Sequence, residues 1–257
     1  MPFSPDSPVG LALLFIAGAL AAAVNAFAGG GTLVSFPVLI GLGVGELQAN
    51  ATNSVALWPG SLSSAFGYRD RLGEFKSRLT ALIPPTLAGA LAGSLLLVAT
   101  PADLFKAVVP WLILTATLLL AFQPQVRAWV AGAKHGQSPM LGLLLQFAIS
   151  VYGGYFGAGM GIMMLAAMAL YLDADIHQMN AVKNWLAVVI NVVAMGIFVW
   201  KGLVLWIPCL SLAAGAVLGG FVSARASQKV PADSLRRLVV VYGLLMAGVF
   251  FWRLAQQ

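Results

Sequence analysis

The chain has 257 residues, of which 60% are hydrophobic and 9% charged, and its mean hydropathy is +0.93. Soluble domains carry about 25% charged residues, so this composition excludes a soluble fold and indicates an integral membrane protein. The net charge of +6 is interpreted as orienting charge on cytoplasmic loops and not as a nucleic-acid-binding surface.

Apolar segments follow one another from the N-terminus. A helix needs about 20 apolar residues to cross a bilayer core, and only helices satisfy their backbone polar groups there economically. The first segment is not interpreted as a signal peptide, because the residues before it contain Asp6 and no Lys or Arg. The segments expected in the first half are Val9–Ala28, the short Gly31–Val44, Ala49–Gly67, Leu79–Val98 and Leu104–Phe122.

The second half repeats the first with a constant offset in residue number, so that residue 48 corresponds to residue 178. Its segments are Met140–Phe156, the short Gly161–Leu172, Met179–Val199, Gly202–Ala224 and Leu235–Leu254. The offset aligns Gln48-Ala49-Asn50-Ala51 with Gln178-Met179-Asn180-Ala181, and Pro101-Ala102-Asp103 with Pro231-Ala232-Asp233. We therefore expect one membrane domain over residues 1–257, with repeats at 9–122 and 140–254 and a cytoplasmic linker at 123–139.

Basic residues predict how the halves are oriented. Loop 68–78 carries Arg69, Arg71, Lys76 and Arg78, whereas in the second half the basic loop is a later one, 224–237. Because positive loops stay cytoplasmic, this exchange predicts two repeats of inverted topology with a periplasmic N-terminus. Arg253, near the predicted external C-terminus, goes against the rule. The predicted fold class is an all-α polytopic membrane protein, each repeat a glycine-broken helical hairpin plus three transmembrane helices.

Short, glycine-interrupted segments at matching positions point to a transporter site. A helix that starts inside the membrane presents unpaired N–H groups and about half a positive charge, and glycine lets a ligand approach the backbone. Two such starts facing each other are predicted to bind one small anion. The candidate substrate-binding residues are Asn25, Gly29, Gly30, Gly31, Asn53, Ser54, Gly157, Gly159, Gly161, Lys183, Asn184 and Asn191.

The candidate binding residues also have purely structural explanations. The glycine runs are also explained by helix packing, the asparagines by interhelical hydrogen bonds, and Lys183 by a side chain that reaches the membrane edge. Glu46 and His177 are proton-coupling candidates or loop residues. Gly89-x-x-x-Gly93 and Gly215-x-x-x-Gly219 are interpreted as packing motifs, and Cys209 as a packing residue.

The residues of both halves resemble a known family. Ala28–Gly43, which includes Pro37, followed by Ala49–Ser54, is similar to the first-half motif of the TauE/SafE sulfite exporter family. Gly157–Gly161, Ala181–Asn184, Asn191 and Lys201-Gly202 resemble its second-half motif. Lys183-Asn184 stand where a Thr-Ser pair is common, and Ala167 replaces the proline that would match Pro37. The resemblance implies transport of sulfur-containing anions in a bacterial inner membrane.

The predicted function is a secondary transporter of sulfite, organosulfonate, sulfoacetate or thiosulfate, working by alternating access. An anion channel, an intramembrane enzyme and a structural scaffold are the alternatives. The enzyme is disfavoured because Ser61 and Ser63 have no nearby histidine in the sequence. No metal, cofactor or nucleic acid is expected. The expected partners are a small anionic substrate and the lipid bilayer, with a homodimer left open.

Overall fold

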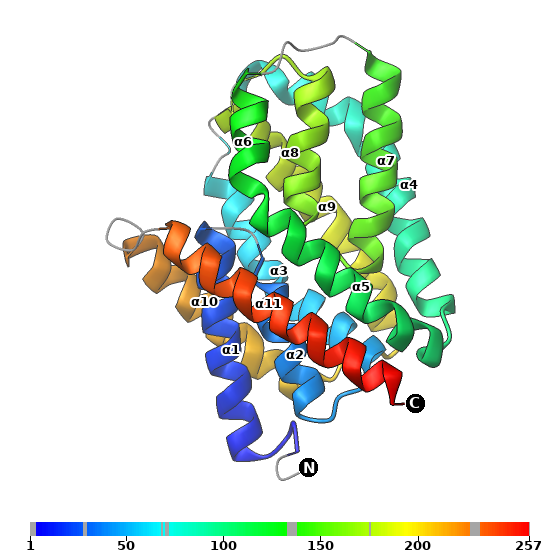
Figure 1. Ribbon diagram of the computed structural model, residues 1–257. Coiled ribbons are helices and arrows are strands. Elements are labelled where there is room, and N and C mark those ends of the chain that lie inside the picture. Colours follow the sequence, from blue (N-terminus) through cyan, green and yellow to red (C-terminus); the bar gives the residue numbers. More distant parts are fainter. Residues whose placement is uncertain are drawn as a thin grey trace.

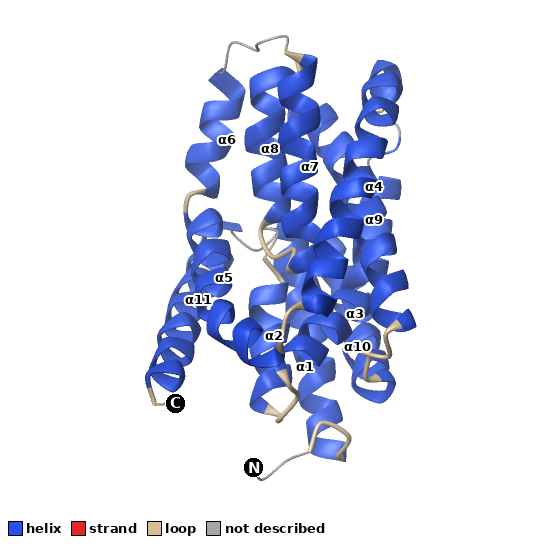
Figure 2. Ribbon diagram, turned by 90° about the vertical axis from the view of Figure 1, so that its right-hand side faces the viewer, coloured by secondary structure: helices blue, strands red, loops and turns tan. Residues whose placement is uncertain are grey.

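The chain folds into helices joined by short turns (Figures 1 and 2). The computed structural model describes residues 4–27, 30–67, 69, 72–132, 138–174, 176–226 and 232–256. The helices among them are α1 (Pro8–Phe27), α2 (Thr32–Gly41), α3 (Glu46–Gly67), the 3-10 turn η2 (Gly73–Phe75), α4 (Lys76–Ala99), α5 (Ala102–Ala121), α6 (Gln123–Gly132), α7 (Pro139–Tyr155), α8 (Met160–Tyr171), α9 (Ile176–Trp200), α10 (Trp206–Ala226) and α11 (Ala232–Ala255).

Five helices are long and apolar enough to cross a membrane. Within the described residues they comprise Pro8–Asn25 of α1, all of α4 and α5, His177–Trp200 of α9 and Arg236–Ala255 of α11. Shorter apolar stretches lie in α2, α7, α8 and the first part of α10. The predicted all-helical membrane class is therefore confirmed for the part of the chain that the structure describes.

Helix α3 has 22 residues but is not one of the five apolar candidates. Its first half carries Asn50, Thr52 and Asn53, each at most 1% exposed. These polar side chains are covered by other helices and not by lipid, because α3 packs against α2, α9 and α10. A helix in this central position needs no continuous apolar surface.

The predicted linker 123–139 contains a helix that the sequence analysis did not predict. Helix α6 occupies Gln123–Gly132 and packs against α8. Pro124 stands at its second position, where a missing N–H costs nothing. Val130 is buried, so even this short helix covers part of the core.

Helix starts repeat at the predicted spacing. Helices α3, α4 and α5 begin at residues 46, 76 and 102, and α9, α10 and α11 begin at the matching positions 176, 206 and 232. The short helices α2 and α8 have 10 and 12 residues and follow α1 and α7 directly in the chain. One offset thus relates the three later helices of each half.

Glycines bring two helix pairs into close contact, α1 with α10 and α4 with α7. A Cβ on Gly215 or Gly219 would clash with the carbonyl oxygen of Phe15 or Ala19 in α1. In the other pair, a Cβ on Gly89 would lie 2.5 Å from the Phe147 carbonyl oxygen. The predicted packing roles of both glycine motifs are confirmed, because small residues let helix backbones approach closely.

The outer surface is rich in large apolar side chains. Trp111, Leu144, Leu210 and Leu245 are each at least 60% exposed, although they lie within helices. A soluble monomer rarely exposes apolar surface on this scale. The exposure is what helices in contact with lipid chains require, in agreement with the membrane class.

Candidate functional site

A polar cluster surrounds the start of α2. The Gly31 N–H donates to the Asn25 Oδ1 over 2.7 Å, so the end of α1 caps the next helix. The Ser35 hydroxyl donates to the Asn53 Oδ1, and the Asn53 Nδ2 lies 3.4 Å from the Thr32 Oγ1. Asn53 therefore reaches across from α3 to the first turn of α2.

The backbone at this start leaves no room for a side chain. A Cβ on Gly31 would clash with the Ala21 carbonyl oxygen and would lie 2.8 Å from the Asn25 side chain. Gly30 and Gly31 are both buried, so the positive end of α2 lies inside the protein. Gly29, the third predicted glycine, lies outside the described residues.

A second cluster surrounds the start of α8. The chain turns between α7 and α8 at Gly157 and Gly159, both with φ of +78°, which favours glycine over residues with a Cβ. The Tyr152 hydroxyl donates to the Ala158 carbonyl oxygen over 2.6 Å and holds the turn from inside.

Lys183 lies against the first turn of α8. A Cβ on Gly161, the second residue of that helix, would be 3.5 Å from the Lys183 Cδ and 3.9 Å from its Nζ. The ammonium donates to the Asn180 Oδ1 over 2.8 Å, one turn earlier in α9. The half-buried Lys183 thus places a full positive charge beside a helix end that already carries about half of one.

Three hydrogen bonds connect α3 to the second half of the chain. The Asn50 Nδ2 donates to the Tyr155 carbonyl oxygen over 2.9 Å, beside the break between α7 and α8. The Asn191 Nδ2 donates to the Ser61 Oγ over 3.1 Å, and the Leu205 N–H donates to the Thr52 Oγ1 over 3.0 Å. Helix α3 is therefore joined to α9, to the break before α8 and to the turn after α9.

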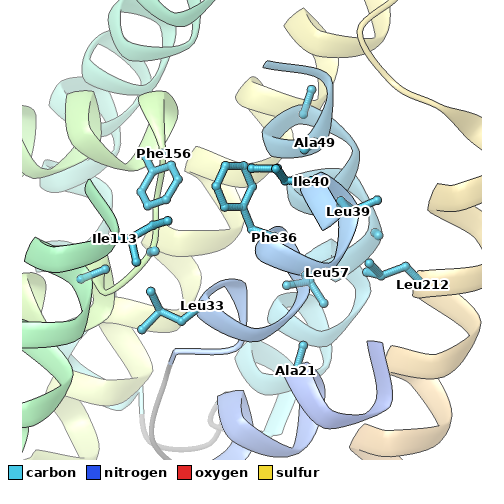
Figure 3. Close-up of a cluster of buried hydrophobic side chains, with 14 of the residues drawn as sticks. Ala21, Leu33, Phe36, Leu39, Ile40, Ala49, Leu57, Ile113, Phe156 and Leu212 are labelled. Carbon is cyan, nitrogen blue, oxygen red and sulfur yellow. The ribbon is translucent and has the colours of Figure 1, made fainter. Parts of the chain in front are cut away.

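Apolar side chains lie between the two helix breaks (Figure 3). Phe36 of α2 meets Phe156 at the second break edge to face, with ring centroids 5.5 Å apart. Leu33 and Ile113 complete this contact. One cavity near the start of α3 and another near the start of α7 have no glycine of the breaks in their lining. Buried apolar side chains from α2, α5 and the second break thus pack together in this region.

The remaining candidates have separate positions. The Ser54 hydroxyl donates to the Asn50 carbonyl oxygen of its own helix, and Asn184 is half-buried next to Lys183. Glu46, the first residue of α3, lines a cavity at one end of the molecule, and His177 is exposed at the start of α9. Among the described residues no group of His, Cys, Asp and Glu is arranged to hold a metal ion.

Sequence reasoning missed Ser35, Thr32 and Asn50 as members of these clusters. Asn50 is 1% exposed, and its Oδ1 has no hydrogen-bond partner among the described residues. Its position in the repeated Gln-x-Asn-Ala sequence was a usable signal, because a buried polar residue in a membrane segment needs a reason.

These features define a polytopic helical membrane protein whose two short helices begin inside the fold beside polar side chains. Residues 14–250 match the sulfite exporter TauE/SafE family. The chain belongs to this family of membrane transporters.

Similar proteins extend over nearly the whole chain. A probable membrane transporter protein of Haemophilus influenzae is 29% identical, covering 93% of this chain and 93% of the relative. A protein of Sinorhizobium with the same description, ORF9, is 28% identical over 92% of this chain and 90% of its own length. The Escherichia coli probable membrane transporter protein YfcA is 25% identical over 94% of this chain and 90% of its own length. No solved structure matches the chain significantly.

Proposed function

We propose that the chain is a secondary transporter that moves small sulfur-containing anions across a bacterial inner membrane by alternating access. The expected substrates are sulfite, organosulfonate, sulfoacetate or thiosulfate. One observation carries the proposal: matching residues of α3 and α9 lie at the starts of both short helices. Asn53 contacts Thr32 at the start of α2, and Lys183, its counterpart in the repeat, lies beside Gly161 at the start of α8.

The chemistry of these two helix starts suits an anion. Helix N-termini direct N–H groups and positive potential toward a ligand, and the low dielectric inside a membrane protein strengthens that potential. Lys183 adds a cation on a long side chain, and Asn53 adds an amide with two donors. The Gly31 N–H at the start of α2 already donates to Asn25, so this donor is not available to an anion. We therefore expect the start of α8 to be the stronger half of the site.

The two halves are proposed to form an inverted repeat. Contacts support a two-fold relation between the halves, because α1 packs on α10 as α7 packs on α4, and α3 meets α10 as α9 meets α4. One cavity is lined by the turn after α2, the first turns of α5 and the end of α11. The rule that positive loops stay cytoplasmic assigns these elements to the periplasm. The other cavity is lined by the starts of α4 and α7 and the end of α8, which the same rule assigns to the cytoplasm.

Each short helix is proposed to be re-entrant. With 10 and 12 residues, α2 and α8 extend about 15–18 Å, roughly half of a bilayer core. Each packs back along the helix before it, α2 on α1 and α8 on α7. Their starts would then lie near the midplane, where inverted-repeat transporters bind substrate.

Alternating access requires the halves to move relative to each other. The apolar contact of Phe36 with Phe156 closes the space between the breaks, and its opening would connect the two polar clusters. A rigid movement of one half against the other is the usual way to open such a contact.

Flux into proteoliposomes tests the proposal. Sulfite, thiosulfate, sulfoacetate and an alkylsulfonate should each be compared with chloride, and at least one should show saturable uptake and counterflow against its own gradient. Lys183→Gln should slow that uptake, whereas Lys201→Gln, in the exposed turn after α9, should not. Linear, non-saturating flux without counterflow would indicate a channel instead, and no flux of any sulfur anion would refute the substrate class.

A further inference from the structure

A cavity separate from both helix breaks lies at one end of the molecule. It has a volume of about 480 Å³ and is bounded by the turn after α2, the starts of α3 and α5 and the end of α11. This volume suits a small organic molecule. Its lining residues are Ile40, Gly43, Val44, Gly45, Glu46, Lys106, Phe250, Arg253, Leu254 and Gln256.

The charges in this cavity are unequal. Two cations, Lys106 and Arg253, and one carboxylate, Glu46, belong to the lining, which therefore carries a net positive charge. Glu46 at the start of α3 and Arg253 in the last turn of α11 each have the sign that the dipole of their own helix favours. Lys106 has the sign that the dipole of its own helix disfavours, because it lies in the second turn of α5, close to the positive end of that helix.

The rest of the lining is apolar. Ile40, Val44, Phe250 and Leu254 form a wall beside the two cations, and the first three of these side chains are buried. An inorganic oxyanion gains nothing from such a wall, whereas an anion with an apolar body gains from its burial. The cavity therefore combines the two features that recognise an organic anion.

The matching place in the other half is built differently. Gln123, the counterpart of Arg253 in the repeat, is 5% exposed and begins α6, which packs on α8. The position of Gln123 is therefore buried where α6 begins, whereas Arg253 is exposed at the cavity.

We propose that this cavity is a peripheral site for a monoanionic group attached to an apolar body. The group would lie between Lys106 and Arg253, and the apolar body against Val44 and Phe250. Such a ligand reaches the cavity either from water, as an aryl or alkyl sulfonate or carboxylate, or from the bilayer, as an anionic lipid. The proposal does not depend on transport through the helix breaks.

Calorimetric titration of benzenesulfonate into the full chain in phosphatidylcholine nanodiscs tests the aqueous source. Lys106→Gln and Arg253→Gln should each weaken binding about tenfold, the value of a lost charge-assisted contact. Arg78→Gln, at the smaller cavity, serves as the matched control and should bind like the original chain. Glu46→Gln should tighten binding, a result that damage to the fold would not produce. Methanesulfonate, which lacks the apolar body, should bind more weakly than benzenesulfonate.

Phosphatidylglycerol retained through purification tests the lipid source. If the two cation variants retain less of it than Arg78→Gln does, while benzenesulfonate binds poorly, the site stands and its ligand is a lipid. Unchanged benzenesulfonate affinity together with unchanged lipid retention in both variants overturns the proposal. Binding that is lost in Lys183→Gln but kept in Lys106→Gln also overturns it, because the ligand would then occupy the central site.

Discussion

Asn191 of α9 donates a hydrogen bond to Ser61 of α3 over 3.1 Å, and the two residues are separated by the repeat offset of 130. Two positions that match in the repeat can touch only where the halves meet. Helices α3 and α9 therefore meet at this pair. The bond thus joins the two halves of the chain directly.

A double-mutant cycle on Ser61→Ala and Asn191→Ala measures this contact. Side-chain hydrogen bonds between membrane helices average about 0.6 kcal/mol, so we expect a coupling free energy of that size in unfolding experiments in detergent. Combining Asn191→Ala with Asp103→Ala, an exposed residue at the start of α5, should be additive. Additive effects for the first pair would show that the contact contributes nothing to stability.

Gly31→Ala should lower the free energy of unfolding by about 1–3 kcal/mol, the usual cost of an overpacked site. The new Cβ would meet the Ala21 carbonyl oxygen and the Asn25 side chain and would disturb the cap of α2. The control is Gly41→Ala in the last position of the same helix, where nothing lies within 4 Å. Thermal unfolding in detergent compares them, and equal melting temperatures would argue against a tightly closed helix start.

The sequence was sufficient to predict most of the helix positions. Apolar runs, glycine runs and a constant offset are local signals, and they placed the breaks around Gly31 and Gly157 correctly. Asn53 and Lys183 were predicted to line the substrate site because polar residues in membrane segments are costly. The structure brings each of them to a helix start, Asn53 to α2 and Lys183 to α8.

Other features depend on tertiary contacts that no local pattern contains. Phe36 and Phe156 meet between the breaks, but in a chain that is 60% hydrophobic a single phenylalanine carries no signal. Helix α6 has only ten residues and no long apolar run to signal a helix, and it packs on α8. The cavity beside Lys106 joins residues from separate segments, which the sequence alone does not bring together.

Lys183→Gln should raise the KM for anion uptake about tenfold and change kcat less, because a charge beside the α8 start contributes mainly to binding. Glutamine keeps much of the side-chain length and removes the charge. Lys183→Arg keeps the charge and should retain more of the affinity. Uptake kinetics in proteoliposomes provide both constants. If all three chains share one KM, Lys183 has only the structural role of bonding to Asn180.

Labelling of single cysteines tests the proposed inverted topology. Cys209 is the only cysteine of the chain and is buried, so Cys209→Ala provides a cysteine-free background. A cysteine introduced at exposed Asp103 or Gln256 should react with a membrane-impermeant maleimide in intact cells. The reason is that the start of α5 and the end of α11 are both predicted to be periplasmic. A cysteine at exposed Arg78 or Pro139 should react only after the membrane is opened. Labelling of Gln256→Cys and Arg78→Cys from the same side would place the end of α11 with the start of α4. The inverted arrangement, and with it the pairing of the two helix starts near the midplane, would then have to be abandoned.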